Sequence, residues 1–252
     1  MSKLILLGAG AMKRWNNHLG GPKFMAPVGG RPLLSDTIDR FRKLGTDDIT
    51  FVTREKVPAA SDTRQVVFSD NPDAAPSSKF LSSREEWNAD GWTTLAFADV
   101  WWSSTALQLV DLELPGLIIF IGRKGPSRFT ECAYGEIFAL RFGAESHGII
   151  ENALAEVDAL HSKKTPQPSG WGLYRTLKSH LKDDGAAQAV FLDVDDYTDD
   201  FDFPRDYKRW TKNYESGNFW VTKDRKEVTT SVPPLLVVAL LILGAAIGAF
   251  LF

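Results

Sequence analysis

Residues 3–14 read Lys-Leu-Ile-Leu-Leu-Gly-Ala-Gly-Ala-Met-Lys-Arg, an apolar run that ends in a glycine-rich loop and two basic residues. Four strongly apolar residues between a lysine and a glycine are typical of a short buried strand. The same run is too short for the apolar region of a secretory signal peptide. Apolar runs of similar length recur along the chain, with helix-like stretches between them. This alternation predicts an α/β fold, a three-layer α/β/α sandwich with a mostly parallel mixed sheet.

The spacing of apolar residues places the expected elements. Strands are expected at 3–7, 48–53, 65–68, 93–98, 117–121 and 189–194, and helices at 33–44, 78–88, 149–160, 172–181 and 204–214. Residues 135–142 fit either a strand or a helix. Ligands of such sheets bind where the parallel strands end. We therefore expect the functional residues in the loops 8–32, 69–78, 99–105 and 193–206.

The C-terminal residues 235–252 contain no charge and nothing more polar than glycine. Eighteen such residues form a helix of about 27 Å, close to the thickness of a bilayer core. We therefore expect a main domain at 1–222, a juxtamembrane linker at 223–234 and one transmembrane helix at 235–252. The alternative is a buried terminal helix of the core, although such a helix rarely lacks a polar face.

The flanks of this apolar run predict its orientation. Lys223, Arg225 and Lys226 precede it and no charge follows it, so the positive-inside rule leaves the main domain on the cytoplasmic side. The expected location is thus a membrane, with a single-pass C-terminal anchor and a cytoplasmic domain. Gly244 and Gly248 form a small-xxx-small pattern that would allow a helix-mediated homodimer.

Cysteine and charge counts exclude some classes of function. The single cysteine, Cys132, excludes an intrachain disulfide and a cysteine-cage metal site. No basic stripe is interleaved with aromatic residues, so nucleic-acid binding is not expected. Residues 1–45 carry eight Lys or Arg against two Asp, whereas residues 193–206 carry seven Asp against one Arg. This asymmetry suits a site for phosphates and a divalent cation, although two solvated surface patches would give the same counts.

Three interpretations of the glycine-rich loop compete. A dinucleotide fingerprint needs a third glycine where Lys13 stands, and a Walker loop needs a Gly-Lys-Ser/Thr that is missing here. A triphosphate-binding loop remains, because Gly8 and Gly10 carry no Cβ and let the backbone approach a base and a phosphate. Arg14 and Lys23 would then reach the phosphates from two sides. For the glycines alone, a plain tight turn is the simpler alternative.

The residues beyond the loop carry a family resemblance. Residues 21–34 read Gly-Pro-Lys-Phe-Met-Ala-Pro-Val-Gly-Gly-Arg-Pro-Leu-Leu, and together with the glycine loop they resemble the opening signature of the nucleotidyltransferases. These are the sugar-phosphate nucleotidylyltransferases, the cytidylyltransferases and the molybdopterin nucleotidyltransferases, which have a glycosyltransferase-A type fold. Met12 replaces a family glycine and Lys13 replaces a threonine. The resemblance implies catalytic roles for Lys23 and Arg14, and nucleotide contacts from Leu7, Gly8, Ala9, Gly10 and Lys13.

Two later segments agree with this resemblance. Asp99, in Phe-Ala-Asp-Val at 97–100, and Asp202, in Asp-Phe-Asp-Phe-Pro at 200–204, match the family's two metal-binding aspartates. Ala98 stands where the family has glycine. The resemblance therefore implies a site for Mg²⁺, which prefers carboxylate oxygens. Without it, Asp99 would be an ordinary turn residue and Asp202 part of a helix N-terminus.

Other side chains are candidates for substrate contacts. In the family, a comparable loop contacts the base, and the helix after it carries a serine. Ser78, Ser82 and Ser83 are the candidates for that serine here, and Ser78 is assigned to nucleotide binding. Trp171, Tyr174 and Arg175 lie where acceptor-binding residues of the family could lie. Core aromatics beside a surface arginine are the stronger interpretation of these three.

The resemblance implies the chemistry of an Mg²⁺-dependent nucleotidyltransferase. Such an enzyme moves a nucleoside monophosphate from a nucleoside triphosphate to a phosphorylated acceptor, such as a sugar phosphate, and releases pyrophosphate. Two alternatives remain at this point. A membrane-tethered glycosyltransferase would use a sugar nucleotide as donor, but it usually shows Asp-x-Asp where this chain reads Ala98-Asp99-Val100. A degenerate, non-catalytic nucleotide-binding protein would account for Met12 and Ala98.

Overall fold

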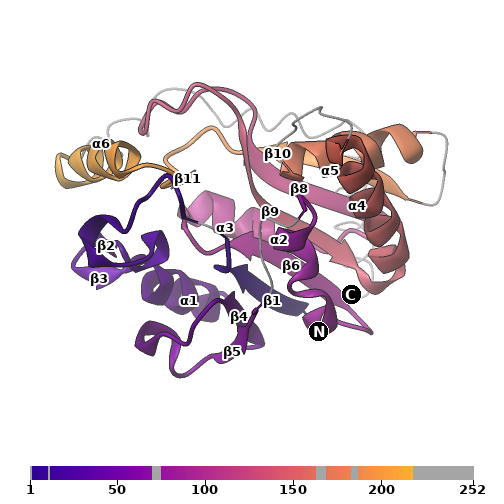
Figure 1. The fold of residues 1–252 in the computed structure, drawn as a ribbon, viewed down its shortest axis with the longest axis horizontal. Helices are drawn as coiled ribbons and strands as arrows, with labels where there is room; N and C mark the ends of the chain where they lie inside the picture. The colour runs from indigo at the N-terminus through magenta and orange to yellow at the C-terminus, as the bar shows by residue number, and fades with distance from the viewer. Residues whose placement is uncertain (1, 11, 70–74, 163–168, 183–186, 218–252) are drawn as a thin grey trace, which may run out of the picture.

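The computed structural model of the chain describes residues 2–10, 12–69, 75–162, 169–182 and 187–217. Its centre is a seven-stranded sheet in the order β10-β8-β9-β6-β1-β4-β5 (Figure 1). The strands are β1 (Ser2–Leu7), β4 (Ile49–Thr53), β5 (Arg64–Val67), β6 (Trp92–Phe97), β8 (Leu117–Arg123), β9 (Glu136–Gly143) and β10 (Gln188–Asp193). Only β9 runs antiparallel to its neighbours in this sheet. The predicted mostly parallel mixed sheet is confirmed, and residues 135–142, open from sequence, form a strand.

Helices cover both faces of the sheet. They are α1 (Leu33–Lys43), α2 (Ser78–Leu81), α3 (Ser104–Val110), α4 (His147–Ser162) and α5 (Ser169–His180). The side chains of β1 alternate between two core layers, one on each face of the sheet. On one face, Leu4 and Leu6 pack with residues of α1 and α3. Ile5 and Leu7 instead pack with residues of α2, α4 and α5. Side chains of a strand alternate between its faces, so this pattern is that of a helix–sheet–helix sandwich.

A third core cluster joins the last described helix, α6 (Pro204–Glu215), to the segments that follow β1, β6 and β8 in the chain. Beside it lie two small antiparallel sheets, β2 (Pro27–Val28) with β3 (Arg31–Pro32), and β7 (Val100–Trp101) with β11 (Asp199–Asp200). The rings of Trp101 and Trp210 lie 5.0 Å apart in this cluster. Because Asp200 pairs with Val100, the acidic segment near residue 200 is brought beside the end of β6.

The expected helix at 78–88 is shorter in the structure. Helix α2 ends at Leu81, and a 3₁₀ turn, η4 (Arg84–Glu86), follows it. Ser83 accounts for the break, because its hydroxyl donates to the carbonyl oxygen of Phe80 at 2.8 Å and accepts from the Trp87 indole at 3.0 Å. The remaining 3₁₀ turns are η1 (His18–Gly20), η2 (Lys23–Met25), η3 (Pro58–Ala60) and η5 (Ala144–Ser146).

Helix α3 and the two-residue strands were not expected from sequence. Helix α3 has seven residues, too few for apolar periodicity to show. The Ser103 hydroxyl caps it by accepting from the Ala106 amide at 2.9 Å. The predicted transmembrane helix at 235–252, its linker and residues 218–222 of the predicted main domain lie outside the described residues. Among the helices that the structure describes, none has both the length and the apolar character that crossing a bilayer requires.

Gly122 allows a close approach of β8 and β9 at a register shift between Ile121 and Gly122. A Cβ at this position would lie 2.1 Å from the carbonyl oxygen of Glu136. We expect Gly122→Ala to lower the free energy of unfolding by about 1–3 kcal/mol, because backbone atoms must move. Gly125→Ala is the control, since nothing lies within 4 Å of its Cβ position. Urea denaturation measures both, and equal stability of the two variants would contradict this close approach.

Candidate functional site

A cavity of about 260 Å³ lies at the carboxyl ends of β1 and β6, where the fold predicts a ligand. The glycine loop, η2, α2 and the segment after β11 surround it. Ten predicted site residues line it: Leu7, Gly8, Ala9, Gly10, Lys13, Arg14, Lys23, Ser78, Asp99 and Asp202. The structure therefore brings residues from five separate segments of the chain to one site.

The two glycines of the loop have different surroundings. The Gly8 amide donates to the carbonyl oxygen of Val52 at 2.7 Å, which fixes the loop against β4. A Cβ on Gly8 would lie 2.5 Å from the ring of Phe51, whereas a Cβ on Gly10 would meet nothing within 4 Å. Packing thus accounts for Gly8, and Gly10 leaves backbone open to the cavity.

Lys23 lies in η2 and reaches across the cavity floor to two carboxylates. Its ammonium forms an ion pair with Asp99 and donates to Oδ1 of Asp202 at 2.9 Å. Burial disfavours its charge, but the carboxylates of Asp99 and Asp202 outweigh that effect and raise the pKa of Lys23 above its ordinary value. Lys23 is therefore a permanent positive charge at this point of the cavity.

Arg14 contacts the same cluster from the open side. Its Nη1 lies 2.5 Å from Oδ2 of Asp202 and 3.3 Å from the hydroxyl of Tyr134. Its guanidinium also lies over the Phe203 ring, 5.5 Å from the centroid. Burial would raise the pKa of Asp202, but Lys23 and Arg14 hold it below its usual range. Asp202 is thus a stable carboxylate with a cation on each oxygen.

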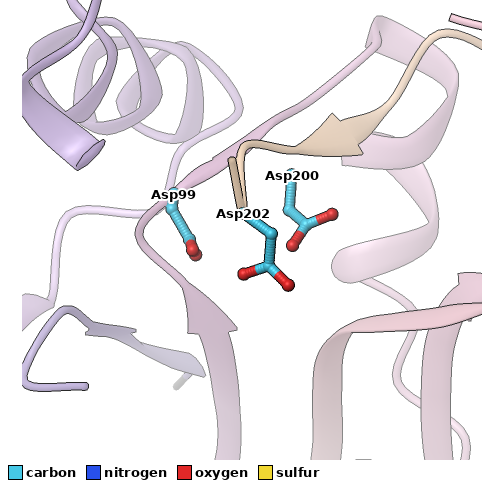
Figure 2. A group of neighbouring side chains, drawn as sticks. All are labelled: Asp99, Asp200 and Asp202. Carbon is cyan, nitrogen blue, oxygen red and sulfur yellow. The ribbon is translucent and has the colours of Figure 1, made fainter. Parts of the chain in front are cut away.

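Three carboxylates, those of Asp99, Asp200 and Asp202, lie close together, as Figure 2 shows, and Asp99 and Asp202 line the cavity. One oxygen from each lies within 4.8 Å of the others. Asp99 follows β6, whereas Asp200 and Asp202 come from β11 and the segment after it. Carboxylate oxygens are the donors that Mg²⁺ prefers, so this donor set fits the implied metal.

Asp200 was not assigned from sequence, although a local signal was present. In the extended run Asp-Phe-Asp at 200–202, alternation places both acids on one side of the chain and Phe201 on the other. Phe201 is fully buried in the cluster around α6. An apolar residue anchored between two acids could therefore have predicted that both acids lie on the same side of the chain, toward Asp99.

A second acidic group lies next to Asp200. Arg123 donates to Oδ1 of Asp199 at 2.7 Å and to Oε2 of Glu136 at 3.2 Å. Burial, together with nearby negative charge, raises the pKa of Glu136 to about 7. Burial and the neighbouring Glu136 also raise the pKa of Asp200 well above its ordinary value. Both carboxyls therefore bind a proton more tightly than an exposed carboxyl does.

Helix α2 supplies one wall of the cavity. Ser78 lines the cavity, and its hydroxyl accepts from the Ala75 amide at 3.2 Å. Ser82 and Lys79 line the same wall; Lys79 was not anticipated. Ser83, another sequence candidate, is buried in the turn after α2 and is not part of the cavity lining. Ser78, Lys79 and Ser82 are three or four residues apart or adjacent, so they share one face of the helix.

The three predicted acceptor residues lie on α5, and none of them lines this cavity. The Trp171 indole stacks on Phe191 at 5.1 Å and donates to the carbonyl oxygen of Gly135 at 2.8 Å. Tyr174 packs edge-on against Phe120 at 5.1 Å. Arg175 lies in a groove between α4 and α5. Their placement gives the acceptor prediction no support and matches core aromatics beside a surface arginine.

Comparison with known proteins agrees with the predicted resemblance. The sequence model of the MobA-like NTP transferase domain matches residues 4–110, which include the glycine loop, Lys23 and Asp99. This part of the chain is similar to that domain, and the predicted resemblance to nucleotidyltransferases is confirmed. None of the curated proteins compared with the chain matches its sequence.

Solved structures of nucleotidyltransferases share the fold. The CTP:phosphocholine cytidylyltransferase of Streptococcus pneumoniae is 14% identical, with a TM-score of 0.58 over 84% of this chain and 99% of that chain. The inositol-1-phosphate CTP transferase of T. maritima is 15% identical, with a TM-score of 0.54 over 85% and 96%. A nucleotidyl transferase from Methanothermobacter is 17% identical, with a TM-score of 0.55 over 86% and 99%. At these identities the likeness establishes the fold.

The raised pKa of Glu136 predicts a pH dependence of stability in metal-free buffer. Between about pH 4.5 and 7 the folded state binds more protons at Glu136 than the unfolded state, so this carboxyl destabilises the fold as pH rises. As pH rises from 4.5 to 8, we expect the unfolding free energy of Glu136→Gln to increase by about 3 kcal/mol relative to that of the unmodified protein.

Urea denaturation across this pH range measures the difference in unfolding free energy between the two proteins. Glu131→Gln is the matched control, because Glu131 lies in the loop that leads into β9 and its side chain is 65% exposed. A constant difference between Glu136→Gln and the unmodified protein would contradict the raised pKa.

Proposed function

We propose that this chain, whose residues 4–110 match the model of the MobA-like NTP transferase domain, is a metal-dependent nucleotidyltransferase. It would move a nucleoside monophosphate from a nucleoside triphosphate to a phosphorylated small-molecule acceptor and release pyrophosphate. The observation that carries the proposal is the cavity beyond the glycine loop. There the Lys23 ammonium is paired with the carboxylates of Asp99 and Asp202, and an oxygen of Asp200 lies within 4.8 Å of an oxygen of each.

The geometry supports an order of contacts along a bound triphosphate. The open backbone at Gly10 allows close approach of the nucleotide, and Lys13 adds charge to the same wall. Lys23 would stabilise negative charge that develops on the α-phosphate, and Arg14 would hold the leaving pyrophosphate. Asp99, Asp200 and Asp202 would hold Mg²⁺, which when bound neutralises phosphate charge. Because the attacking acceptor oxygen is already an anion, positioning and charge stabilisation suffice, and a general base is unnecessary.

The two rival functions find less support in the site. A glycosyltransferase of similar fold usually has two acids where β6 ends, but here the residue two after Asp99 is Trp101, which is 4% exposed in the aromatic cluster. A degenerate scaffold would be expected to lose the cluster. Instead, Ala98 is fully buried and its amide donates to the carbonyl oxygen of Leu7 at 3.1 Å, with Asp99 still in the cavity.

Pyrophosphate release tests the proposed function. The full chain is incubated with each nucleoside triphosphate, Mg²⁺ and a panel of acceptors. The panel includes sugar phosphates, phosphonates, phosphocholine and inositol 1-phosphate, the last two because structural neighbours are named for them. We expect release that needs one triphosphate and one acceptor. Release of free nucleotide from a sugar nucleotide donor, with none from triphosphates, would instead support the glycosyltransferase.

Lys23→Ala should lower the rate in this assay by at least about 100-fold, because it removes a preorganised charge from the reacting phosphate. Lys43→Ala is the matched control, since Lys43 is exposed at the C-terminal end of α1. Its rate should equal that of the unmodified protein. Normal turnover of Lys23→Ala would refute the role given to Lys23.

We also propose that residues 235–252 anchor the domain to a membrane and leave it on the cytoplasmic side. The support is their uncharged sequence and the three basic residues at 223–226. A chain lacking residues 232–252 should fractionate as soluble protein while the full chain sediments with membranes. The same fractionation for both chains would exclude the anchor. If the product is used to build a lipid or a surface glycan, such an anchor would place its synthesis beside the membrane where it is needed.

A further inference from the structure

The cations of the site occupy the same oxygens that the proposed metal needs. Lys23 is ion-paired with Asp99 and lies 2.9 Å from Oδ1 of Asp202, while Arg14 lies 2.5 Å from Oδ2 of Asp202. Both oxygens of Asp202 therefore face a protein cation. These contacts are short and partly shielded from water, since the side chains of Lys23, Asp99 and Asp202 are 16%, 13% and 18% exposed.

Charge counting shows what a metal ion would meet in this arrangement. Lys23 and Arg14 balance the carboxylates of Asp99 and Asp202. The third carboxyl, Asp200, lies in the same cluster. A divalent cation arriving alone would meet two positive groups already paired with the oxygens of Asp99 and Asp202. Like charges at such short range disfavour its entry.

A triphosphate changes this balance. It carries several negative charges, and its oxygens are acceptors for both the ammonium and the guanidinium. When Lys23 and Arg14 turn to the phosphates, the oxygens of Asp99 and Asp202 become available. Binding of the triphosphate and of the metal would then favour each other, and this coupling is equal in both directions.

We propose that Lys23 is a built-in counter-cation of the metal site. In the protein without nucleotide its ammonium holds Asp99 and Asp202 and keeps a divalent metal out. Triphosphate binding draws it away, so that the metal enters with the nucleotide. This inference rests on the proposed function for the identity of the nucleotide, but its first consequence concerns metal binding alone.

Binding of Mn²⁺ to the full chain tests the proposal, with free Mn²⁺ measured by electron paramagnetic resonance. Without nucleotide the unmodified protein should bind Mn²⁺ weakly, and Lys23→Met should bind it at least tenfold more tightly. Lys79→Met is the matched control. Lys79 lines the same cavity, and its charge acts on Asp202, yet in the described part of the chain only Lys23 and Arg14 are ion-paired with Asp202.

The control separates displacement from general repulsion. If Lys79→Met gains as much affinity as Lys23→Met, or if Lys23→Met gains none, the proposal is overturned. In the double variant Lys23→Met, Asp99→Asn the gain should disappear, which locates the bound ion. Circular dichroism checks the fold of each variant. Lys23→Gln, which keeps a polar head, replaces Lys23→Met if that variant does not fold.

A measurement on the unmodified protein needs no variant. Inorganic tripolyphosphate should raise its affinity for Mn²⁺ at least tenfold beyond what Mn²⁺ binding to tripolyphosphate in solution accounts for. Equal affinity with and without it would overturn the proposal. If no pyrophosphate is released in the nucleotidyltransferase assay but Lys23→Met binds Mn²⁺ more tightly, only the proposed function is refuted. If the protein turns over but Lys23→Met binds Mn²⁺ no more tightly, only the role of Lys23 as a counter-cation is refuted.

Discussion

The ion-pair cluster of Lys23 with Asp99 and Asp202 is the interaction on which the site depends. It joins three segments that are far apart in the sequence: η2, the end of β6 and the segment after β11. Two carboxylates this close repel each other unless a cation lies between them. The ammonium of Lys23 meets that requirement in the protein alone, and it stabilises the arrangement in which a metal and a triphosphate could later share the charge.

The backbone around the cluster is held by the aromatic core next to α6. The Trp15 indole donates to the carbonyl oxygen of Gly21 at 2.8 Å, just before η2. The Trp210 indole donates to the carbonyl oxygen of Tyr197 at 3.0 Å, just before β11. Buried indoles stabilise through area and through one directed hydrogen bond each. The two bonds fix the approach of both chain segments that carry the charged side chains.

Local patterns predicted the regular part of this fold and the one-segment parts of the site. The strands and longer helices follow from apolar spacing, and the glycine loop, Lys23 and Asp99 follow from contiguous sequence. The pairing of β7 with β11 does not, because two residues in each strand carry no periodicity. Alternation around Phe201 was a local signal for Asp200, but its place beside Asp99 depends on this pairing. Glu136 was missed because its place beside Asp200 depends on the antiparallel strand β9, whose type the sequence left open.

Trp171 and Tyr174 show the opposite limit of sequence reasoning. An aromatic pair near an arginine looks like a ligand-binding group, and the same residues are equally suited to a helix that covers a sheet. Only the position of α5 over Phe120 and Phe191 decides between them. Helical spacing predicts which residues share a face, but not whether that face meets solvent, a ligand or a sheet.

The two glycines of the loop after β1, together with Ala98 after β6, show why a departure from a family pattern need not remove a site. Gly8 is required by the ring of Phe51, so its reason is packing, whereas Gly10 opens backbone to the cavity. At residue 98 the chain accommodates an alanine, because its methyl group is buried in the core between α1, α3 and the sheet. The Ala98 amide still bonds to Leu7, and Asp99 still faces Lys23. The substitution thus adds apolar contact and leaves the charged geometry intact, since that geometry is set by backbone pairing rather than by the absence of a Cβ.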